Sequence, residues 1–451
     1  MFDIVLNNGM LIDPKKLIMS YLNIGIENGK VSLLSSEKLK GIKEFDCEGK
    51  IVSPGFVDMH MHEDPLNISN DGFDICISEC MLKMGVTTVI GGNCGIGPLS
   101  PLNYLDIVDK IGYPVNIGLL SSHENLRNNF GSFNKYNNID SDTIHKMSIL
   151  LDEELKGGTL GLSFGIRYIP GLSKNEMIEL CKVVKKYDCI AAAHVRDDAA
   201  QVMASIMELI EVGKESGAKI QVSHIGSMAA YGQMKHVCGL IDSYVANGQD
   251  IGMDCYPYSA FCTSIGSTTF DKGFLERYQT NYDSLELTQG ELVGKSLDAQ
   301  LFETVREKHP DYLVVAHVMK ESEVDMALCH PRSILASDGI LNNGNGHPRA
   351  AGSFPRFIRE YVINKKCISL FEAVNKMTYL PAKRMNISKG ALSIGDDADI
   401  VVFDINTISD NSTFKEPLKS PSGIEYVFIR GNLALKDGVI LNNTLGKPIR
   451  R

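Results

Sequence analysis

The feature that most constrains the fold is an alternation, through the middle of the chain, of short apolar runs with longer amphipathic segments. Strand followed by helix, repeated many times, is typical of a parallel sheet covered by helices. The predicted strands are Phe56–His60, Val86–Ile90, Val115–Leu120, Leu160–Phe164, Ile190–His194, Ile220–His224, Ile251–Cys255, Leu313–His317 and Ile334–Ser337.

These nine strands are one more than a closed barrel of eight requires. We expect Leu313–His317 to be the surplus strand, because it closes a long irregular stretch that we interpret as an insertion around 259–312. Right-handed strand–helix units that close on themselves are the economical arrangement for so many units. We therefore predict an α/β fold with a (β/α)8 TIM-like barrel over 55–391. A doubly wound open sheet is the alternative, but it does not explain where the polar residues fall.

The two ends of the chain resemble each other and differ from its middle. Residues 1–54 and 392–451 contain short predicted strands divided by turns such as Asn7-Asn8-Gly9 and Arg430-Gly431-Asn432. We predict that both termini meet in one small β-sandwich domain beside the barrel.

Two helices carry a start signal in the sequence. Ser173-Lys-Asn-Glu176 and Ser369-Leu-Phe-Glu372 match the capping box, in which the serine and glutamate side chains bond to backbone N–H groups of the first turn. We expect a helix after each.

Composition excludes several classes of protein. The net charge of −10 argues against nucleic acid or an anionic membrane as partner, since either needs a basic face. No stretch reaches the roughly 18 apolar residues of a membrane-spanning helix, and the start does not resemble a secretory signal. The eleven cysteines follow no repeating spacing, which is typical of a reducing compartment where most are buried thiols. We therefore expect a cytoplasmic protein. Its oligomeric state stays open.

Seven polar residues lie at, or just past, the ends of separate predicted strands. They are His60, His62, Cys94, His123, His194, His224 and Asp338. In a β/α barrel the carboxyl ends of the strands form the rim on which catalytic residues gather. The sequence therefore predicts an active site at this rim.

The histidines are spaced as metal ligands would be. His60 and His62 alternate along a strand, so both imidazoles can face one point. His194 and His224 end two successive strands, one strand–helix unit apart. A lone histidine at a strand end is more often a core residue, but two at one level beside a His-x-His pair favour a metal site.

Cys94 and Asp338 extend this pattern. Cys94 lies in a glycine-rich loop, Gly91–Pro98, where the backbone can approach a ligand closely and a thiolate could bind zinc. The alternatives are a buried structural thiol or a phosphate-binding loop, which lacks its Gly-Lys-Ser/Thr signature here. Asp338 could accept and return a proton in metal-assisted hydrolysis, although Ser-Asp-Gly is also an ordinary turn.

Taken together, these motifs resemble a known family. The segment Val52–His62, Val-Ser-Pro-Gly-Phe-Val-Asp-Met-His-Met-His, is similar to the opening motif of the amidohydrolase superfamily, and Ala398–Asp404 is similar to its closing β motif. Within the superfamily the chain resembles the N-acyl-D-amino acid deacylases, which include D-aminoacylases and N-acyl-D-glutamate deacylases. The supporting segments include Gly91–Gly95, Gly161–Gly165 with Tyr168-x-Pro-Gly171, His194-Val-Arg196, Ser337–Gly339 and His347-Pro-Arg349.

The resemblance implies a zinc-dependent enzyme that cleaves the linear amide bond of N-acyl-D-amino acids. It implies one tightly bound zinc ion, and a second, weaker metal position that shares a ligand with it. The implied ligands are Cys94, His194 and His224 for the tight position, with His60 and His62 at the second.

The resemblance also implies roles around the metal. Asp338 would be the base, and Arg349 with Tyr256 or Tyr258 would bind the substrate carboxylate, which suits the planar fork of arginine. Two further candidates for substrate contacts are Arg196, as an oxyanion donor, and His123, for which a structural role is the alternative.

One position departs from the family. Its members commonly carry a lysine two residues after the histidine that corresponds to His224, and this chain has Gly226 there. Losing a cation at a binding site is not a neutral change. A D-dipeptide or a substrate with an altered carboxylate is therefore an alternative.

Two rival functions are less well supported. Cyclic-amide hydrolases, which resemble hydantoinases and dihydroorotases, usually bridge two metals with a carboxylated lysine at the end of the fourth strand, but Gly158–Gly165 contains no lysine. A non-catalytic assembly protein on the same barrel should lack metal ligands, whereas all the expected ones are present.

Overall fold

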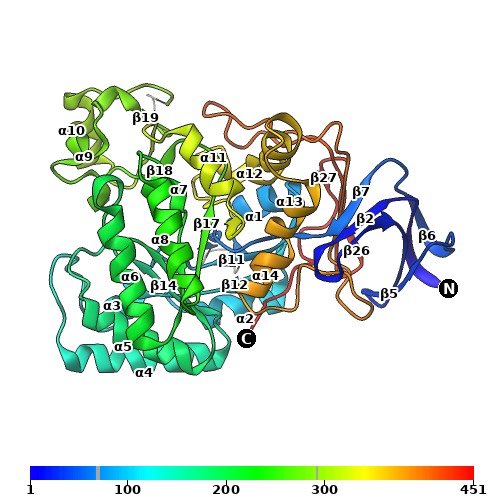
Figure 1. Ribbon diagram of the computed structural model, residues 1–451, viewed down its shortest axis with the longest axis horizontal. Coiled ribbons are helices and arrows are strands. Elements are labelled where there is room, and N and C mark those ends of the chain that lie inside the picture. Colours follow the sequence, from blue (N-terminus) through cyan, green and yellow to red (C-terminus); the bar gives the residue numbers. More distant parts are fainter. Residues whose placement is uncertain (68–71, 291–292) are drawn as a thin grey trace.

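The computed structural model describes residues 1–67, 72–290 and 293–451. Figure 1 shows a large body of helices and parallel strands, with the N-terminal strands gathered at one end of the molecule. The α/β class predicted from the sequence is the class observed.

Parallel strands run through the middle of the chain and follow the predicted positions closely. They pair in chain order, as β8-β11-β12 in one sheet and β13-β14-β15-β16-β17-β21 in another. Their bounds are β8 (Phe56–Asp58), β11 (Val86–Gly91), β12 (Asn116–Leu119), β13 (Ser121–Ser122), β14 (Gly161–Gly165), β15 (Ile190–His194), β16 (Lys219–Val222), β17 (Ile251–Cys255) and β21 (Ser333–Leu335).

Hydrogen bonds connect these two sheets at both junctions. On one side only Leu120 separates β12 from β13, and the Leu160 N–H, just before β14, donates to the Leu119 carbonyl of β12 at 2.8 Å. On the other side Met61 and Gly339 form a parallel bridge, and the Asp338 N–H donates to the His60 carbonyl at 2.8 Å. The first and last parallel strands therefore lie side by side.

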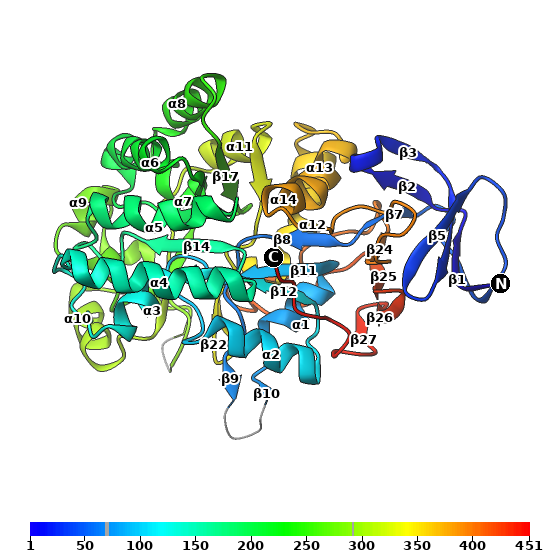
Figure 2. The same ribbon diagram turned by 90° about the horizontal axis from the view of Figure 1, so that it is seen from below.

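Helices connect the strands, and consecutive helices pack against one another on the outside (Figure 2). The principal ones are α1 (Ile77–Lys83), α2 (Pro101–Ile111), α4 (Ser141–Gly157), α5 (Lys174–Lys186), α6 (Val202–Ser216), α8 (Met234–Ala246), α11 (Glu321–Cys329), α12 (Arg349–Phe357), α13 (Leu370–Met377) and α14 (Tyr379–Arg384). No helix in the described ranges is long and apolar enough to cross a membrane.

The two predicted capping boxes differ in the structure. Ser369 and Glu372 form the complete box at α13, with both side chains bonded to backbone N–H groups. At α5 the Ser173 hydroxyl accepts from the Glu176 N–H at 3.2 Å, as predicted. The Glu176 carboxylate, however, is bonded to the side chains of His123 and Arg127 instead of the backbone.

The stretch interpreted as an insertion forms a small sheet of its own. Strands β18 (Phe261–Ser264), β20 (Leu313–Ala316) and β19 (Leu285–Leu287) pair antiparallel in that order. The predicted surplus strand is β20, which lies outside the parallel sheets. Helices α9 (Phe274–Tyr278) and α10 (Ala299–Lys308) belong to the same stretch.

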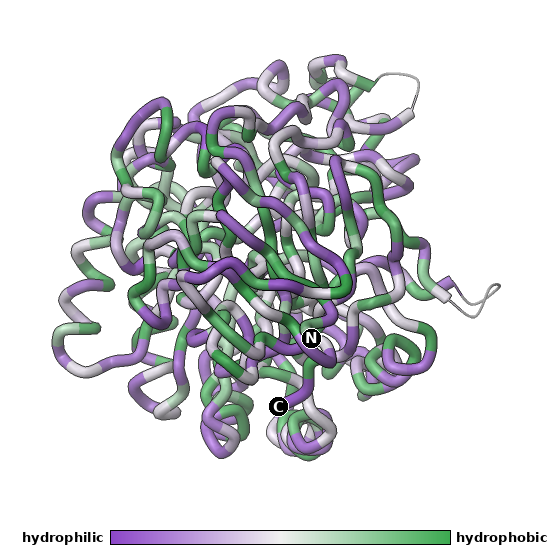
Figure 3. The backbone as a smooth tube through the Cα atoms, turned by 90° about the vertical axis from the view of Figure 1, so that its right-hand side faces the viewer, coloured by the Kyte–Doolittle hydropathy of each residue, from purple (hydrophilic) through white to green (hydrophobic). Residues whose placement is uncertain are grey.

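Strands from both ends of the chain pair with each other. Residues of β24 pair antiparallel with β7, within a seven-stranded sheet of order β27-β26-β25-β24-β7-β2-β3. A four-stranded sheet of order β5-β4-β1-β6 packs against it, since Ile4 and Ile24 share a core with Val52 and Ile400. Figure 3 looks onto this end and shows hydrophobic and hydrophilic segments interspersed along the chain. The bounds are β1 (Phe2–Asn7), β2 (Met10–Asp13), β3 (Ile18–Tyr21), β4 (Asn23–Glu27), β5 (Lys30–Ser35), β6 (Gly41–Asp46), β7 (Ile51–Pro54), β24 (Ile400–Phe403), β25 (Ile424–Ile429), β26 (Asn432–Lys436) and β27 (Val439–Ile440).

The last residues leave these terminal strands and return to the parallel sheet. The Gly446 N–H donates to the Tyr113 carbonyl at 2.8 Å, and the Ile449 N–H donates to the Ile117 carbonyl at 2.7 Å. The prediction assigned all of 392–451 to the terminal β domain and did not anticipate this return.

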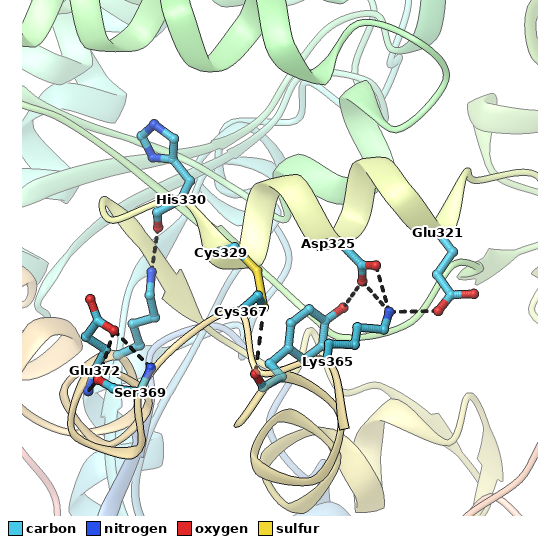
Figure 4. Close-up of a disulfide and its surroundings, with 10 residues drawn as sticks. Glu321, Asp325, Cys329, His330, Lys365, Cys367, Ser369 and Glu372 are labelled. Carbon is cyan, nitrogen blue, oxygen red and sulfur yellow. Dashed lines mark hydrogen bonds and ion pairs between the residues drawn. A yellow bond between two sulfur atoms is a disulfide. The ribbon is translucent and has the colours of Figure 1, made fainter. Parts of the chain in front are cut away.

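One cysteine pair departs from the expectation of free thiols. Cys329, at the end of α11, and Cys367, before α13, form a disulfide (Figure 4). The other nine cysteines are free, and most of them are buried.

Candidate metal centre

Two groups of ligand atoms meet at the carboxyl ends of the parallel strands. One consists of Cys94, His194 and His224, and the other of His60, His62, Cys94 and Asp338. Within each group the ligand atoms all lie within 4.8 Å of one another, and Cys94 belongs to both. The sequence predicted each of these residues at the rim.

In the first group, the ligand atoms of the side chains lie close to one another. The His224 Nε2 lies 3.3 Å from the Cys94 Sγ, while its Nδ1 lies 2.9 Å from the Ser227 hydroxyl. The His194 ring packs edge-on to that of His224, with 4.6 Å between centroids. Burial and the neighbouring His224 lower the pKa of His194 to about 4, so this imidazole is neutral and able to bind a cation.

The second group is organised by a carboxylate that sequence reasoning missed. The His60 Nε2 lies 3.3 Å from both the Cys94 Sγ and the Asp338 Oδ1, and its Nδ1 lies 3.1 Å from the Asp254 Oδ1. Asp254 also accepts from the His224 N–H at 2.8 Å, so it orients two histidines at once. Its place near the end of a predicted strand was the available signal.

Three of these residues have a backbone conformation that is rare for L-amino acids. The φ angles of Cys94, His224 and Asp338 are 54°, 32° and 48°. Each such residue costs roughly 1–3 kcal/mol and persists only where its surroundings hold it. Here the Asp338 and His224 N–H groups donate to the His60 carbonyl and the Asp254 carboxylate. Such residues cluster at functional sites.

The electrostatics favour a cation in this place. Burial raises the pKa of Cys94, but His60, His224 and a hydrogen bond from His194 outweigh it and hold the pKa well below its ordinary value. Burial also opposes ionisation of Asp338, yet the Arg349 guanidinium, His224 and hydrogen bonds from His60 and His62 hold its pKa well below the ordinary range. A thiolate and a carboxylate therefore face the histidine nitrogens, which is a donor set that suits zinc.

A cavity of about 530 Å³ opens directly onto this centre. Its lining residues are His62, Cys94, Ile96, Glu124, Lys135, Tyr136, Tyr168, Cys262, Thr263, Ser264, Gly266, Ser267, Thr268, Pro310, Asp311, Asp338, Ile340 and Arg349. The inserted stretch supplies one wall of the cavity, and the rim of the parallel strands supplies its floor.

Arg349, which the sequence predicts to bind substrate, is among the residues that line this cavity. Its side chain is buried, and its Nη1 lies 2.9 Å from the Asp338 Oδ2. The guanidinium stacks on the Tyr256 ring, 4.6 Å from the centroid, and the Nη2 donates to the Cys262 carbonyl. Apart from these contacts, its Nε makes no hydrogen bond to any described residue. A buried guanidinium with an unused donor is suited to bind a carboxylate.

Tyr168 lines the cavity beside Cys94, although sequence reasoning gave it no role of its own. Its ring packs against His194, with 4.7 Å between centroids. Burial raises the pKa of Tyr168, so its hydroxyl remains a hydrogen-bond donor. The motif around Gly161–Gly171 was the signal that contained it.

The two tyrosines predicted to meet substrate do not line the cavity. Tyr256 lies beneath Arg349, and its hydroxyl is 3.9 Å from the Met319 sulfur. Tyr258 packs on His347 and lies 4.7 Å from the Arg356 guanidinium carbon. The structure places Tyr256 as a support for Arg349, one layer below the cavity.

Arg196 and His123 likewise have other partners. The Arg196 guanidinium bonds to Glu208 and to the Pro170 and Leu172 carbonyls, so it is not free to act as an oxyanion donor. The His123 Nε2 lies 2.7 Å from the Glu176 Oε1 in a fully buried contact. Neither residue lines the cavity, and the structural alternative for His123 is the arrangement observed.

Gly226, where the family commonly has lysine, faces packed side chains. A Cβ added there would lie 2.8 Å from the Cys255 Sγ and 3.4 Å from the Met319 Cε. These two side chains fill the space that a longer side chain at position 226 would need.

Two amidohydrolase family models match the chain, over residues 51–231 and 327–434. The D-aminoacylase of Alcaligenes xylosoxydans xylosoxydans is 28% identical, with 100% of this chain and 98% of that protein covered. The N-acyl-D-glutamate deacylase of the same organism is also 28% identical, over 95% of this chain and 93% of that protein.

A solved structure matches over the whole chain. It is an N-acyl-D-glutamate deacylase from Bordetella bronchiseptica, complexed with zinc and a phosphonate that mimics the tetrahedral intermediate of the reaction. The TM-score is 0.89 at 25% identity, and 100% of both chains is covered.

Proposed function

The chain belongs to the amidohydrolase family, and from this premise we propose that it is a zinc-dependent hydrolase of N-acyl-D-amino acids. The observation that carries the proposal is the meeting of two ligand groups at Cys94, with Asp338 and Arg349 beside them on one cavity floor. The relatives named above are deacylases of this kind.

We also infer that the two parallel sheets form one (β/α)8 barrel. Support comes from the hydrogen bonds at both junctions and from a shared core that includes Met59, Ile90, Leu160, Ile190 and Ile334. We propose that the terminal strands form a separate β-sandwich domain, because their two sheets share a core of their own.

The donor set fits one tightly held zinc ion. Cys94, His194 and His224 would bind it, and His60 with His62 would offer a second position that shares Cys94. When bound, zinc would polarise the amide carbonyl of the substrate and lower the pKa of a water molecule in the site.

The chain's own residues would then move the proton. Asp338 would take a proton from the attacking water and deliver it to the amide nitrogen as the carbon–nitrogen bond breaks, releasing a carboxylic acid and a free amino acid. The Tyr168 hydroxyl is placed to donate to the oxyanion that forms at the carbonyl.

Arg349 would orient the substrate. Its Nε makes no hydrogen bond to a described residue and would donate to the substrate carboxylate, while its Nη1 keeps the ion pair with Asp338. Tyr256 would hold the guanidinium plane from below through the stacked contact.

The direct test is hydrolysis by the purified, zinc-loaded enzyme of N-acetyl amino acids of both hands, beside a cyclic imide. We expect turnover of D substrates, little of L substrates and none of the imide. Preference for the imide would support the hydantoinase-like alternative instead.

A further inference from the structure

We propose that the cavity selects N-acyl-D-amino acids with an uncharged side chain and disfavours those with an acidic one. The inference rests on the proposed function and specifies its substrate class. It is carried by the distribution of charge around the cavity.

A substrate with an acidic side chain brings two carboxylates, and the cavity offers one buried cation. Among the described lining residues, only Arg349 and Lys135 are cationic. Lys135 lies at the mouth with its side chain 47% exposed, and it forms an ion pair with Glu124 at 3.3 Å. Residues 68–71 and 291–292 contain neither lysine nor arginine.

The arginines near the cavity form ion pairs with aspartates of the chain. The Arg167 Nη1 donates to Asp197 at 2.7 Å, and the Arg277 Nε lies 3.2 Å from Asp198. Neither arginine is among the residues that line the cavity. Position 226 offers no cation either, because Cys255 and Met319 fill the space around Gly226.

The acidic residues near the site already hold these cations. Asp311 and Glu124 line the mouth of the cavity. Asp198 lines the adjoining recess beside His194 and His224, and it is 3% exposed. A second substrate carboxylate would have to compete with Glu124 for Lys135 or with Asp198 for Arg277, and desolvating an unpaired carboxylate is strongly unfavourable.

An uncharged side chain, by contrast, meets a suitable wall. Tyr168, Cys262, Thr263, Ser264 and Ile340 are among the residues that line the cavity. They present apolar atoms and small polar groups. Such a wall accepts aliphatic or thioether side chains at no electrostatic cost.

The test compares kcat/KM for N-acetyl-D-leucine and N-acetyl-D-methionine with kcat/KM for N-acetyl-D-glutamate and N-acetyl-D-aspartate, on the zinc-loaded enzyme. We expect the uncharged substrates to be preferred at least about 100-fold. Ser264→Lys, which adds a cation to the wall, should raise the ratio of N-acetyl-D-glutamate to N-acetyl-D-leucine turnover about tenfold. Ser264→Met, of similar length but uncharged, should not raise it.

The outcomes separate this inference from the proposed function. An acidic substrate turned over as well as the uncharged ones by the unaltered enzyme would overturn the inference alone. An equal effect of Ser264→Lys and Ser264→Met on the ratio would also overturn it, since charge would then not be the determinant. Hydrolysis of no N-acyl-D-amino acid would overturn both.

Discussion

Two buried histidine clusters lie near the same rim of the molecule and differ in how their polar groups are satisfied. In the first, Glu176 accepts from the His123 Nε2 and from two nitrogens of Arg127, at 2.6–2.8 Å. In the second, around Cys94, two anionic side chains face several imidazoles, and three residues have a strained backbone. In the first cluster Arg127 balances the charge of Glu176, while the ligand atoms of the second lie close enough together to hold a metal ion.

The comparison teaches how to separate structural from functional histidines. Position at a strand end is common to His123, His194 and His224. What distinguishes them is the partner, because His123 contacts the carboxylate of Glu176, whereas His194 and His224 share a cluster of possible metal ligands with Cys94.

Removing the shared thiol should have the largest effect. Cys94→Ala should lose most bound zinc and about 10⁴-fold in kcat/KM, because both ligand groups lose a donor. Metal content by mass spectrometry and turnover of N-acetyl-D-leucine would measure this. Cys181→Ala, a buried thiol of α5 outside both groups, should keep its zinc, and equal loss in the two variants would argue that Cys94 is only structural.

Replacing the proposed base should separate binding from chemistry. Asp338→Asn should retain zinc at the tight position, while kcat falls about 1,000-fold, since the residue no longer accepts a proton. Single-turnover kinetics with metal analysis of the same sample would show both. Unchanged kcat would remove Asp338 from the proton-transfer role.

Disrupting the cluster of His123, Arg127 and Glu176 should lower the stability of the fold. Glu176→Gln should lower the free energy of unfolding by about 3 kcal/mol, because it leaves Arg127 buried without its counter-charge. Urea unfolding would measure the loss, and zinc content per folded chain should stay unchanged. Loss of zinc with no loss of stability would reverse the roles assigned to the two clusters.

Arg349 should affect binding more than chemistry. Arg349→Lys should raise KM about 10- to 100-fold, because lysine cannot reproduce the planar two-donor fork. Arg356→Lys is the matched control, since Arg356 pairs with Asp410 away from the cavity. Similar KM values in the two variants would contradict the carboxylate-binding role.

The smallest effect is a pH dependence of the stability that Glu176 contributes to the fold. Burial raises the pKa of Glu176, but Arg127 and His123 outweigh it and hold the pKa below the ordinary value of 4.5. Its stabilising contribution is therefore fully present above about pH 4.5 and is lost as the pH falls through the lowered value. The stability difference between the unaltered chain and Glu176→Gln should narrow below about pH 4.5. A difference that narrows as the pH rises would contradict this assignment.

The parallel strands and the rim residues were predictable from the sequence because both follow from local patterns. Short apolar runs mark the strands, and Cys94, His194 and Asp338 stand where those runs end. The return of residues 446–449 to β12 was not predictable, because it depends on backbone pairing between distant segments with no distinctive side chains.

Side-chain contacts between residues far apart in the sequence were also not predicted. Glu176 completes an apparent capping-box sequence, yet tertiary contacts with His123 and Arg127 claim its carboxylate. Arg196 lies two residues after His194, in a motif that suggested a role at the active site. Its guanidinium, however, bonds to Glu208 of α6. Tertiary packing decides which acidic side chain pairs with which basic one, and the spacing of residues in the sequence does not determine that packing.

X-ray absorption at the zinc edge of the purified enzyme would show whether Cys94 binds the metal. We predict one sulfur scatterer at about 2.3 Å together with nitrogen ligands at about 2.0–2.1 Å, and loss of the sulfur shell in Cys94→Ala. Stoichiometric zinc with no sulfur in its first shell, or an enzyme that turns over fully without metal, would contradict the account.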